Sequence, residues 1–96
     1  GSTTFGSDIN NLGQVVGISA TSGSVANNVF ITGPNGVGMT DLGQFAGGSN
    51  WADGINSSGQ IIVNSGVYGY RSFITGAGGV GPTELLPLGE VLIRQL

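Results

Sequence analysis

One turn sequence occurs twice in this chain, and that repetition constrains the fold more than any other feature. The stretch "DINNLGQVVGIS" (8–19) returns as "GINSSGQIIVNS" (54–65), so that Ile9 falls on Ile55 at an offset of 46 residues. The match preserves the Asn, the Gly-Gln pair and the β-branched residues that follow. A turn repeated together with its flanking strand indicates that a whole structural unit has been duplicated.

The second half of each unit matches at a shorter offset. After the next loop the offset drops to 43 residues, where "FITGPNGVGMTDL" (30–42) aligns with "FITGAGGVGPTEL" (73–85). A length change inside a loop, with matches on both sides, is typical of repeats. The sequence therefore divides into Gly1-Ser2, which resembles a protease scar left by expression, a first repeat (3–48), a second repeat (49–89) and a tail (90–96).

Each repeat is expected to contain four short strands. The turns "NNLG" and "NSSG" place Gly where a hairpin needs a left-handed residue, and the strands after them are rich in Val and Ile. No apolar period of 3.6 residues is long enough to predict a helix. The predicted strands are 4–9, 14–19, 29–32 and 39–42 in the first repeat, and 50–55, 60–64, 72–75 and 83–86 in the second. The class is all-β.

Units of 43 to 46 residues with four antiparallel strands have the size of a β-propeller blade. A lone blade cannot cover its own apolar faces, and two blades cannot close a ring. We therefore expect two four-stranded meander repeats, similar to blades, that close by homo-oligomerisation. The alternative is a monomer in which the two sheets pack as a β-sandwich.

The repeated motifs also resemble a known family. "DINNLGQVVG" and "MTDLGQFAGGSNWADGINSSGQ" are similar to the HAF-family extracellular repeats of bacteria, and the resemblance spans residues 4 to about 89. The His-Ala-Phe triplet of that family is replaced by 28–30 (Asn-Val-Phe) and 71–73 (Arg-Ser-Phe), so only the Phe is kept. The resemblance implies an exported, repeat-built β protein without an established catalytic activity, and it supplies no active-site residues.

Composition narrows the classes of partner. Charged residues make up 7% of the chain, Lys is absent, and the formal net charge is −3. A nucleic-acid binder needs cations to replace phosphate counterions, and an anionic membrane surface attracts the same groups, so neither partner is expected. The neutral chain, rich in Gly, Ser, Thr and Asn, is typical of a bacterial extracellular or cell-surface protein.

The inventory of reactive side chains predicts no enzyme. His and Cys are both absent, which excludes Ser–His and Cys–His nucleophiles and the usual zinc ligands. Asp41 and Glu84 occupy equivalent places in the two repeats, so we expect each to make a hydrogen bond at a turn or strand end. No cofactor is expected.

A calcium loop is the one metal site that the sequence suggests. "DINNLG" begins like D-x-N-x-x-G, with Asp8 and Asn10 in ligand positions. The fifth position is Leu12, no acidic residue closes the loop, and the second repeat carries its Asp at Asp53 instead. The competing interpretation is an Asx turn whose side chains accept backbone N–H bonds.

Aromatic residues of the second repeat suggest a carbohydrate site. Sugar rings stack on aromatic faces while their hydroxyls bond neighbouring polar groups. The competing role for the Trp is packing between blades, because the first repeat has Phe5 at the equivalent position. The candidate ligand-binding residues are Trp51, Asp53, Tyr68, Tyr70 and Arg71. The function expected is thus a non-catalytic structural or recognition module, and the alternative is a purely architectural repeat or an engineered propeller fragment with no ligand.

The tail is the last segment to assign. Its apolar run, 91–93, favours a strand that pairs with an open sheet edge, and the competing interpretation is a frayed terminus.

Overall fold

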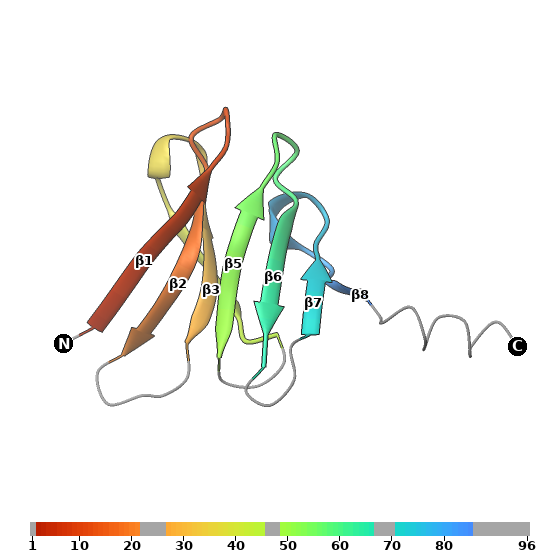
Figure 1. The fold of residues 1–96 in the computed structure, drawn as a ribbon. Helices are drawn as coiled ribbons and strands as arrows, with labels where there is room; N and C mark the ends of the chain where they lie inside the picture. The colour runs from red at the N-terminus through yellow and green to blue at the C-terminus, as the bar shows by residue number, and fades with distance from the viewer. Residues whose placement is uncertain (1, 22–26, 46–48, 67–70, 86–96) are drawn as a thin grey trace, which may run out of the picture.

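The computed structural model describes residues 2–21, 27–45, 49–66 and 71–85, and these form two antiparallel sheets of four strands each. Within each sheet the strands follow one another in sequence order, as a meander (Figure 1). The strands are β1 (Ser2–Ile9), β2 (Val15–Thr21), β3 (Asn28–Thr32), β4 (Met39–Gly43), β5 (Asn50–Ile55), β6 (Ile61–Ser65), β7 (Arg71–Ile74) and β8 (Thr83–Leu85). The predicted all-β class with two four-stranded repeats is confirmed.

Helical structure within the described residues is limited to two short 3₁₀ turns, η1 (Pro34–Gly36) and η2 (Ala77–Gly79). Each lies between the third and fourth strand of its sheet, in a glycine-rich loop. Neither turn approaches the length that a helix needs to cross a lipid bilayer.

The repeated Asn builds the hairpin between the first two strands of each sheet. Asn10 Oδ1 accepts the backbone N–H groups of Leu12 (3.1 Å) and Gln14 (3.0 Å), and its amide donates to Gln14 Oε1 (2.8 Å). Asn56 makes the same bonds to Ser58 and Gln60. The Asn side chain thus satisfies the turn, and the Gln holds the Asn in place, which explains why the motif N-x-x-G-Q is written twice.

Two separate features require glycine at this position of the motif. Gly13 has φ +78° and Gly59 has φ +81°, in the left-handed region that other residues avoid. A Cβ on Gly13 would lie 2.7 Å from the backbone N of Asn35, and one on Gly59 would lie 3.0 Å from that of Gly78. The hairpin turn therefore packs directly against the 3₁₀ turn of its own sheet, and only glycine leaves room for the contact.

The ladder between the first two strands has the same irregularity in both sheets. The ladder between the first two strands shifts register between Gly6 and Asp8 in one sheet, and between Ala52 and Gly54 in the other. The bulge of the first sheet thus recurs at the equivalent place in the second. The ladders between the third and fourth strands differ, because only the first sheet shifts register there, between Val29 and Phe30.

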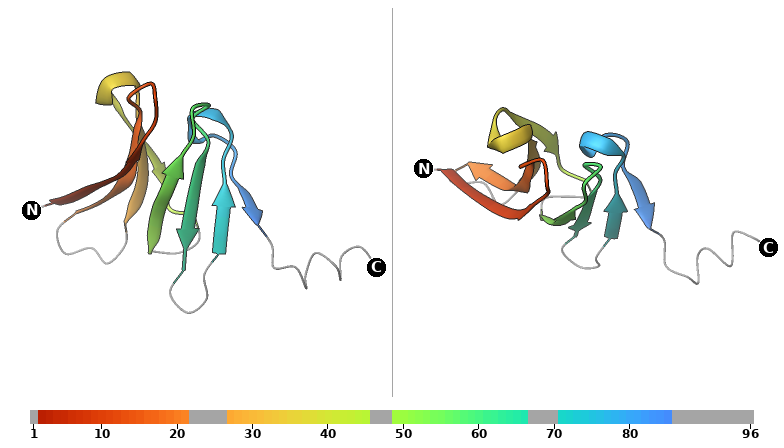
Figure 2. Two further views of the ribbon diagram at one scale, coloured as in Figure 1. Left: turned by 45° about the horizontal axis from the view of Figure 1, so that its top comes forward. Right: turned by 90° about the horizontal axis from the view of Figure 1, so that it is seen from above.

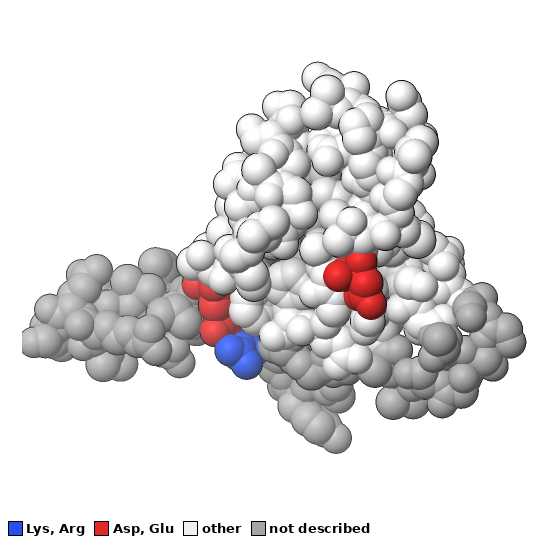
Figure 3. Space-filling model, turned by 180° about the vertical axis from the view of Figure 1, so that it is seen from behind, with Lys and Arg blue, Asp and Glu red and all other residues white. Residues whose placement is uncertain are grey.

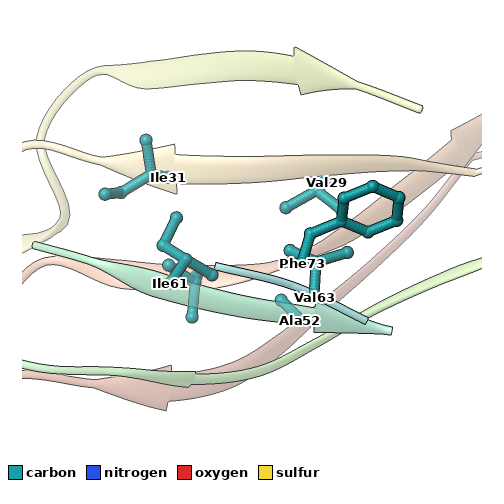
Figure 4. Packing of buried hydrophobic residues seen from close by; sticks show 7 residues of the cluster. Val29, Ile31, Ala52, Ile61, Val63 and Phe73 are labelled. Atoms are coloured by element: carbon teal, nitrogen blue, oxygen red, sulfur yellow. The ribbon is translucent and has the colours of Figure 1, made fainter. Parts of the chain in front are cut away.

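The core lies between the two sheets. Buried side chains of β2 and β3 meet buried side chains of β5, β6 and β7, and Figure 4 shows them filling the space between β3 and β6. The sheets stand side by side in every view, with β5 in contact with β1, β2 and β3 (Figure 2). The cluster consists of Val16, Val29, Ile31, Ala52, Ile61, Val63 and Phe73.

The two sheets use opposite faces for this contact. Residues paired directly across an antiparallel ladder share a face, so the registers assign each paired residue to one side of its sheet. Val16 pairs with Ile31 on the inner face of the first sheet, whereas their repeat equivalents, Ile62 and Ile74, pair on the face of the second sheet that points away. The contact is therefore head to tail, with non-equivalent faces of the two repeats meeting.

Polar contacts at both ends of the strands join the sheets as well. Near the hairpins, Asp8 Oδ2 accepts the backbone N–H of Ile55 (3.0 Å), and Asn10 donates to the carbonyl of Asn56 (3.0 Å). Asp8 thereby covers a donor on β5, which is the edge strand of its sheet. An edge N–H that is paired in this way is not available to other strands.

Asn50 ties the junction at the opposite end and is fully buried, with 0% of its surface exposed. Its amide donates to the carbonyl of Asn27 (2.9 Å), and its backbone N–H donates to Asn27 Oδ1 (2.7 Å). Its Oδ1 accepts the N–H of Phe45 (3.0 Å) and the hydroxyl of Ser65 (2.8 Å). A buried amide with every group bonded fixes one geometry of the two sheets.

Candidate functional site: the outer face of the second sheet

The outer face of the second sheet is the surface that best combines exposed aromatic, apolar and polar side chains. Its members all point away from the first sheet by the ladder registers. They are Trp51, Gly54, Ile62, Asn64, Ser72, Ile74 and Leu85.

A polar group lies at the centre of this face. Asn64 donates its amide to Asp53 Oδ2, and its Oδ1 accepts the hydroxyl of Ser72. Asp53 occupies the bulge of β5 and has no ladder partner, so its carboxylate reaches Asn64. Trp51 pairs with Asn64 across the ladder and is 41% exposed. An indole beside a carboxylate, an amide and a hydroxyl forms this part of the outer face.

Two of the predicted ligand-binding residues are brought together here, and one is not. Trp51 and Asp53 both border Asn64. Arg71 pairs with Ser65, which is on the inner face, so its side chain starts from the opposite side of the sheet. Tyr68 and Tyr70 lie outside the described residues. The predicted site therefore stays a prediction, with its described polar core at Trp51 and Asp53.

Arg71 is engaged in an ion pair at the rim of the sheet. Its guanidinium donates to both carboxylate oxygens of Glu84 (2.6 and 2.7 Å) and lies 5.7 Å from the ring centre of Phe73. In the first sheet the equivalent pair is Asn28 and Asp41, joined by bonds of 3.0 and 3.1 Å. The expected strand-end hydrogen bonds of Asp41 and Glu84 are thereby confirmed.

The oxygens of the suggested calcium loop are occupied by backbone donors. Asp8 Oδ1 accepts the N–H of Ile9 (2.9 Å) while its Oδ2 accepts that of Ile55, and Asn10 Oδ1 closes its own turn. These bonds are those of the Asx-turn interpretation. Within the described part of the chain, no three acidic, His or Cys side chains gather as a metal site would require.

A hollow opens beside the polar group, at the hairpin end of the same face. Its volume is about 250 Å³. Gly54, Ile62 and Ile74 contribute from the outer face, and Asp8 contributes from β1. The walls are lined by Asp8, Gly54, Ile55, Asn56, Gln60, Ile61, Ile62 and Ile74.

Charge contributes little to the surface. Figure 3 shows the charged side chains as a few isolated spots on one face of the molecule. The whole chain has five acidic and two basic residues, so most of its polar surface groups are neutral.

Sequence reasoning missed Asn64 and Ser72, although a signal for both was present. Alignment of the repeats places Asn64 on Ile18 and Ser72 on Val29. A polar residue in one copy, where the other copy has an apolar residue, marks a face with a different environment.

Comparisons with known proteins assign no relative. No protein-family model matches the chain, and neither curated proteins nor solved structures give a significant match.

Proposed function

We propose that this chain is a non-catalytic structural module, two blades of a β-propeller-type assembly that is completed by further copies of the same chain. The observation that carries the proposal is the head-to-tail contact of the two repeats, in which the inner face of one sheet meets the opposite face of the other. Such a contact between identical units has no natural end, because each added unit presents the same free face again.

The distribution of apolar residues favours blades over a two-sheet sandwich. A sandwich buries one face of each sheet and presents a polar face to water. Here Ile62 and Ile74 lie on the outer face of the second sheet, and Ile9 and Met39 lie on the outer face of the first. Ile9 is 62% exposed and Met39 is 59% exposed. Apolar residues on both faces are what an internal blade requires.

The setting that we propose is the exterior of a bacterium. The low charge, the Gly-, Ser-, Thr- and Asn-rich composition and the resemblance to HAF-family repeats support it. The proposal includes no cofactor, no nucleic acid and no membrane partner.

Light scattering behind a sizing column tests the assembly. Propellers commonly have about four to eight blades, so a closed ring needs about two to four copies of the chain. We expect one species at two to four times the 9.5 kDa of the chain. A folded monomer over the whole concentration range would refute the proposal and favour the sandwich.

A second candidate function is carbohydrate recognition, and the grouping of Trp51 with Asp53, Asn64 and Ser72 favours it. Binding on a glycan array should then be lost in Trp51→Ala and also in the double variant Tyr68→Ala/Tyr70→Ala. Arg71→Ala serves as the rim control. The two candidates compete for one surface, because a copy stacked on the outer face would cover Trp51. Array signals that Trp51→Ala leaves unchanged would exclude this face as the sugar site.

A further inference from the structure

We infer that a second copy of this chain docks on the outer face of the second sheet through the outer face of its own first sheet, and that its Ile9 and Val15 enter the hollow beside Gly54. The inference rests on the proposed function and deepens it, since it names both surfaces and the occupant. It extends to the contact between chains the same arrangement that joins the two sheets within a chain.

The repeat equivalence identifies the docking residues. On the inner face of the first sheet, Val16 and Ile31 pack against Ile61 of the second. The equivalents of Val16 and Ile31 in the second sheet are Ile62 and Ile74. The equivalents of Ile55 and Ile61 in the first sheet are Ile9 and Val15. A second copy that repeats the internal contact therefore brings Ile9 and Val15 onto Ile62 and Ile74.

Equivalent residues of the two repeats differ in how far they are exposed, as expected if a second copy would cover the more exposed one. Ile31 is 3% exposed, whereas Ile74 is only partly buried. Ile61 is fully buried at 0%, whereas its equivalent Val15 is only partly buried. In both pairs the residue inside the existing contact is covered, and the residue on an outer face is not. At these two positions the outer faces keep an apolar residue that is less buried than its equivalent in the internal contact.

The hollow has the place that the docking mode requires. It is lined by Ile62 and Ile74, which correspond to the residues of the first sheet against which Ile55 and Ile61 pack. Gly54 widens it, because the equivalent residue of the first sheet is Asp8. A volume of about 250 Å³ accommodates aliphatic side chains without a rearrangement of the sheet.

The polar residues of the outer face do not oppose the contact. Asn64 and Ser72 replace the apolar Ile18 and Val29 of the first sheet, but they are bonded to one another. A polar group that carries its own partner loses less on burial than an unpaired one.

Docking of a second copy would repeat one of the two hydrogen bonds that join the sheets near the hairpins. Within the chain, Asn10 donates to the carbonyl of Asn56. In the docked pair, Asn56 would take the role of Asn10 and donate to the carbonyl of Asn10 in the second copy. The bond from Ile55 to Asp8 has no counterpart, because Gly54 stands in place of the carboxylate. The contact between chains is therefore the weaker of the two and is reversible on dilution.

Substitutions on the two outer faces test the inference, because a head-to-tail contact needs one of each. Ile9→Asp blocks the outer face of the first sheet, and Ile74→Asp blocks that of the second. Each variant alone should run at the monomer mass of 9.5 kDa on light scattering. An equimolar mixture should double that mass, because each chain supplies the face that its partner lacks. The mixture is measured at tenfold higher concentration, since an open pair lacks the added stability of a ring.

Matched controls come from the repeats themselves. Val37 and Val80 are equivalent residues after the 3₁₀ turns, exposed at 72% and 70% and outside both sheets. Val37→Asp and Val80→Asp should keep the mass of the unchanged chain. Circular dichroism confirms that each variant is folded, and Leu85→Asp, at a position that is 51% exposed, replaces Ile74→Asp if the latter unfolds.

The outcomes separate this inference from the proposed function. An unchanged chain that is monomeric at all concentrations overturns both. An unchanged chain that assembles, with assembly surviving Ile9→Asp and Ile74→Asp, overturns only the docking mode. A mixture that stays monomeric also overturns it. Assembly in Ile9→Asp alone, but not in Ile74→Asp, would indicate a symmetric contact between two second sheets and would overturn it as well.

Discussion

The first and second sheets have the same strands, turns and bulge, yet they differ in which face is buried. In the first sheet the face with Val16 and Ile31 is buried, and in the second sheet the equivalent face, with Ile62 and Ile74, is only partly buried. Local sequence explains what the sheets share, because the hairpin, the bulge and the 3₁₀ turn are each built from residues of one repeat. The difference in burial arises because each sheet packs against the other on only one of its faces. Identical units thus occupy different environments, and matched substitutions measure what the environment contributes.

The largest contrast is expected between Ile31 and Ile74, which are identical residues at equivalent positions. Ile31→Ala removes a side chain that is 3% exposed and leaves a cavity, so it should lower the free energy of unfolding by about 2–5 kcal/mol. Ile74→Ala, on the outer face, should lower the free energy of unfolding by about 1 kcal/mol in dilute solution, because the Ile74 side chain buries less apolar area. Urea unfolding at several protein concentrations measures both.

Concentration sharpens this comparison. If a second copy covers Ile74, the cost of Ile74→Ala should rise with protein concentration, whereas that of Ile31→Ala should not. Equal costs in dilute solution would contradict the assignment of one face as inner and the other as outer.

A smaller effect, similar in the two sheets, is expected from the hairpin glycines. Gly13→Ala and Gly59→Ala should each cost about 1–3 kcal/mol, since a side chain at positive φ is strained and a Cβ approaches the facing turn. Gly13 should be the more sensitive, because its Cβ would lie 2.7 Å from the backbone N of Asn35, compared with 3.0 Å to that of Gly78. Thermal unfolding measures the pair.

Gly36→Ala is the control for strain alone. Its φ is +73°, and a Cβ there would have nothing within 4 Å. A loss of stability as large as that of Gly13→Ala would show that the contact between the turns contributes nothing.

The difference between Asn10 and Asn56 isolates a single bond between the sheets. Both side chains accept two backbone N–H groups in their own turn, but only Asn10 donates to the other sheet, at 3.0 Å from the Asn56 carbonyl oxygen. Asn10→Ala should therefore cost more than Asn56→Ala by about 0.5–1.5 kcal/mol, the net contribution of one hydrogen bond. Chemical unfolding of both variants in dilute solution gives the difference. A larger loss for Asn56→Ala would contradict the bond.

These contrasts also show why the sequence predicts the strands but not their partners. The strands and turns follow from local signals, such as N-x-x-G-Q and the β-branched runs that follow it. The dipeptides Val15-Val16 and Ile61-Ile62 place an apolar residue on each side of a strand. That pattern predicts that both faces are to be covered, but it does not say which face meets which. The choice depends on packing between residues that lie far apart in the chain.

The candidate site was predictable to a similar degree. Trp51 and Asp53 stand close in sequence on one strand, so their proximity could be foreseen. Asn64 and Ser72 come from other strands and depend on the ladder register. Arg71 was predicted to belong to the same site, yet the ladder register places it on the face opposite to that of Trp51. Proximity along the chain does not distinguish the faces of a sheet.

The smallest effect is expected where the two repeats differ in charge. Arg71 and Glu84 form an ion pair where the first sheet has Asn28 and Asp41, and the Arg71 side chain is 55% exposed. Arg71→Asn gives the second sheet the residue of the first, and we expect a loss of less than about 1 kcal/mol, because surface ion pairs are weak and the amide still bonds the carboxylate. Raising the salt concentration should shrink the difference between the two chains, since screening acts on the ion pair and little on the neutral donor. A loss that is large and independent of salt would mean that the guanidinium acts through its contact with Phe73, 5.7 Å from the ring centre, and that the two repeats differ in packing as well as in charge.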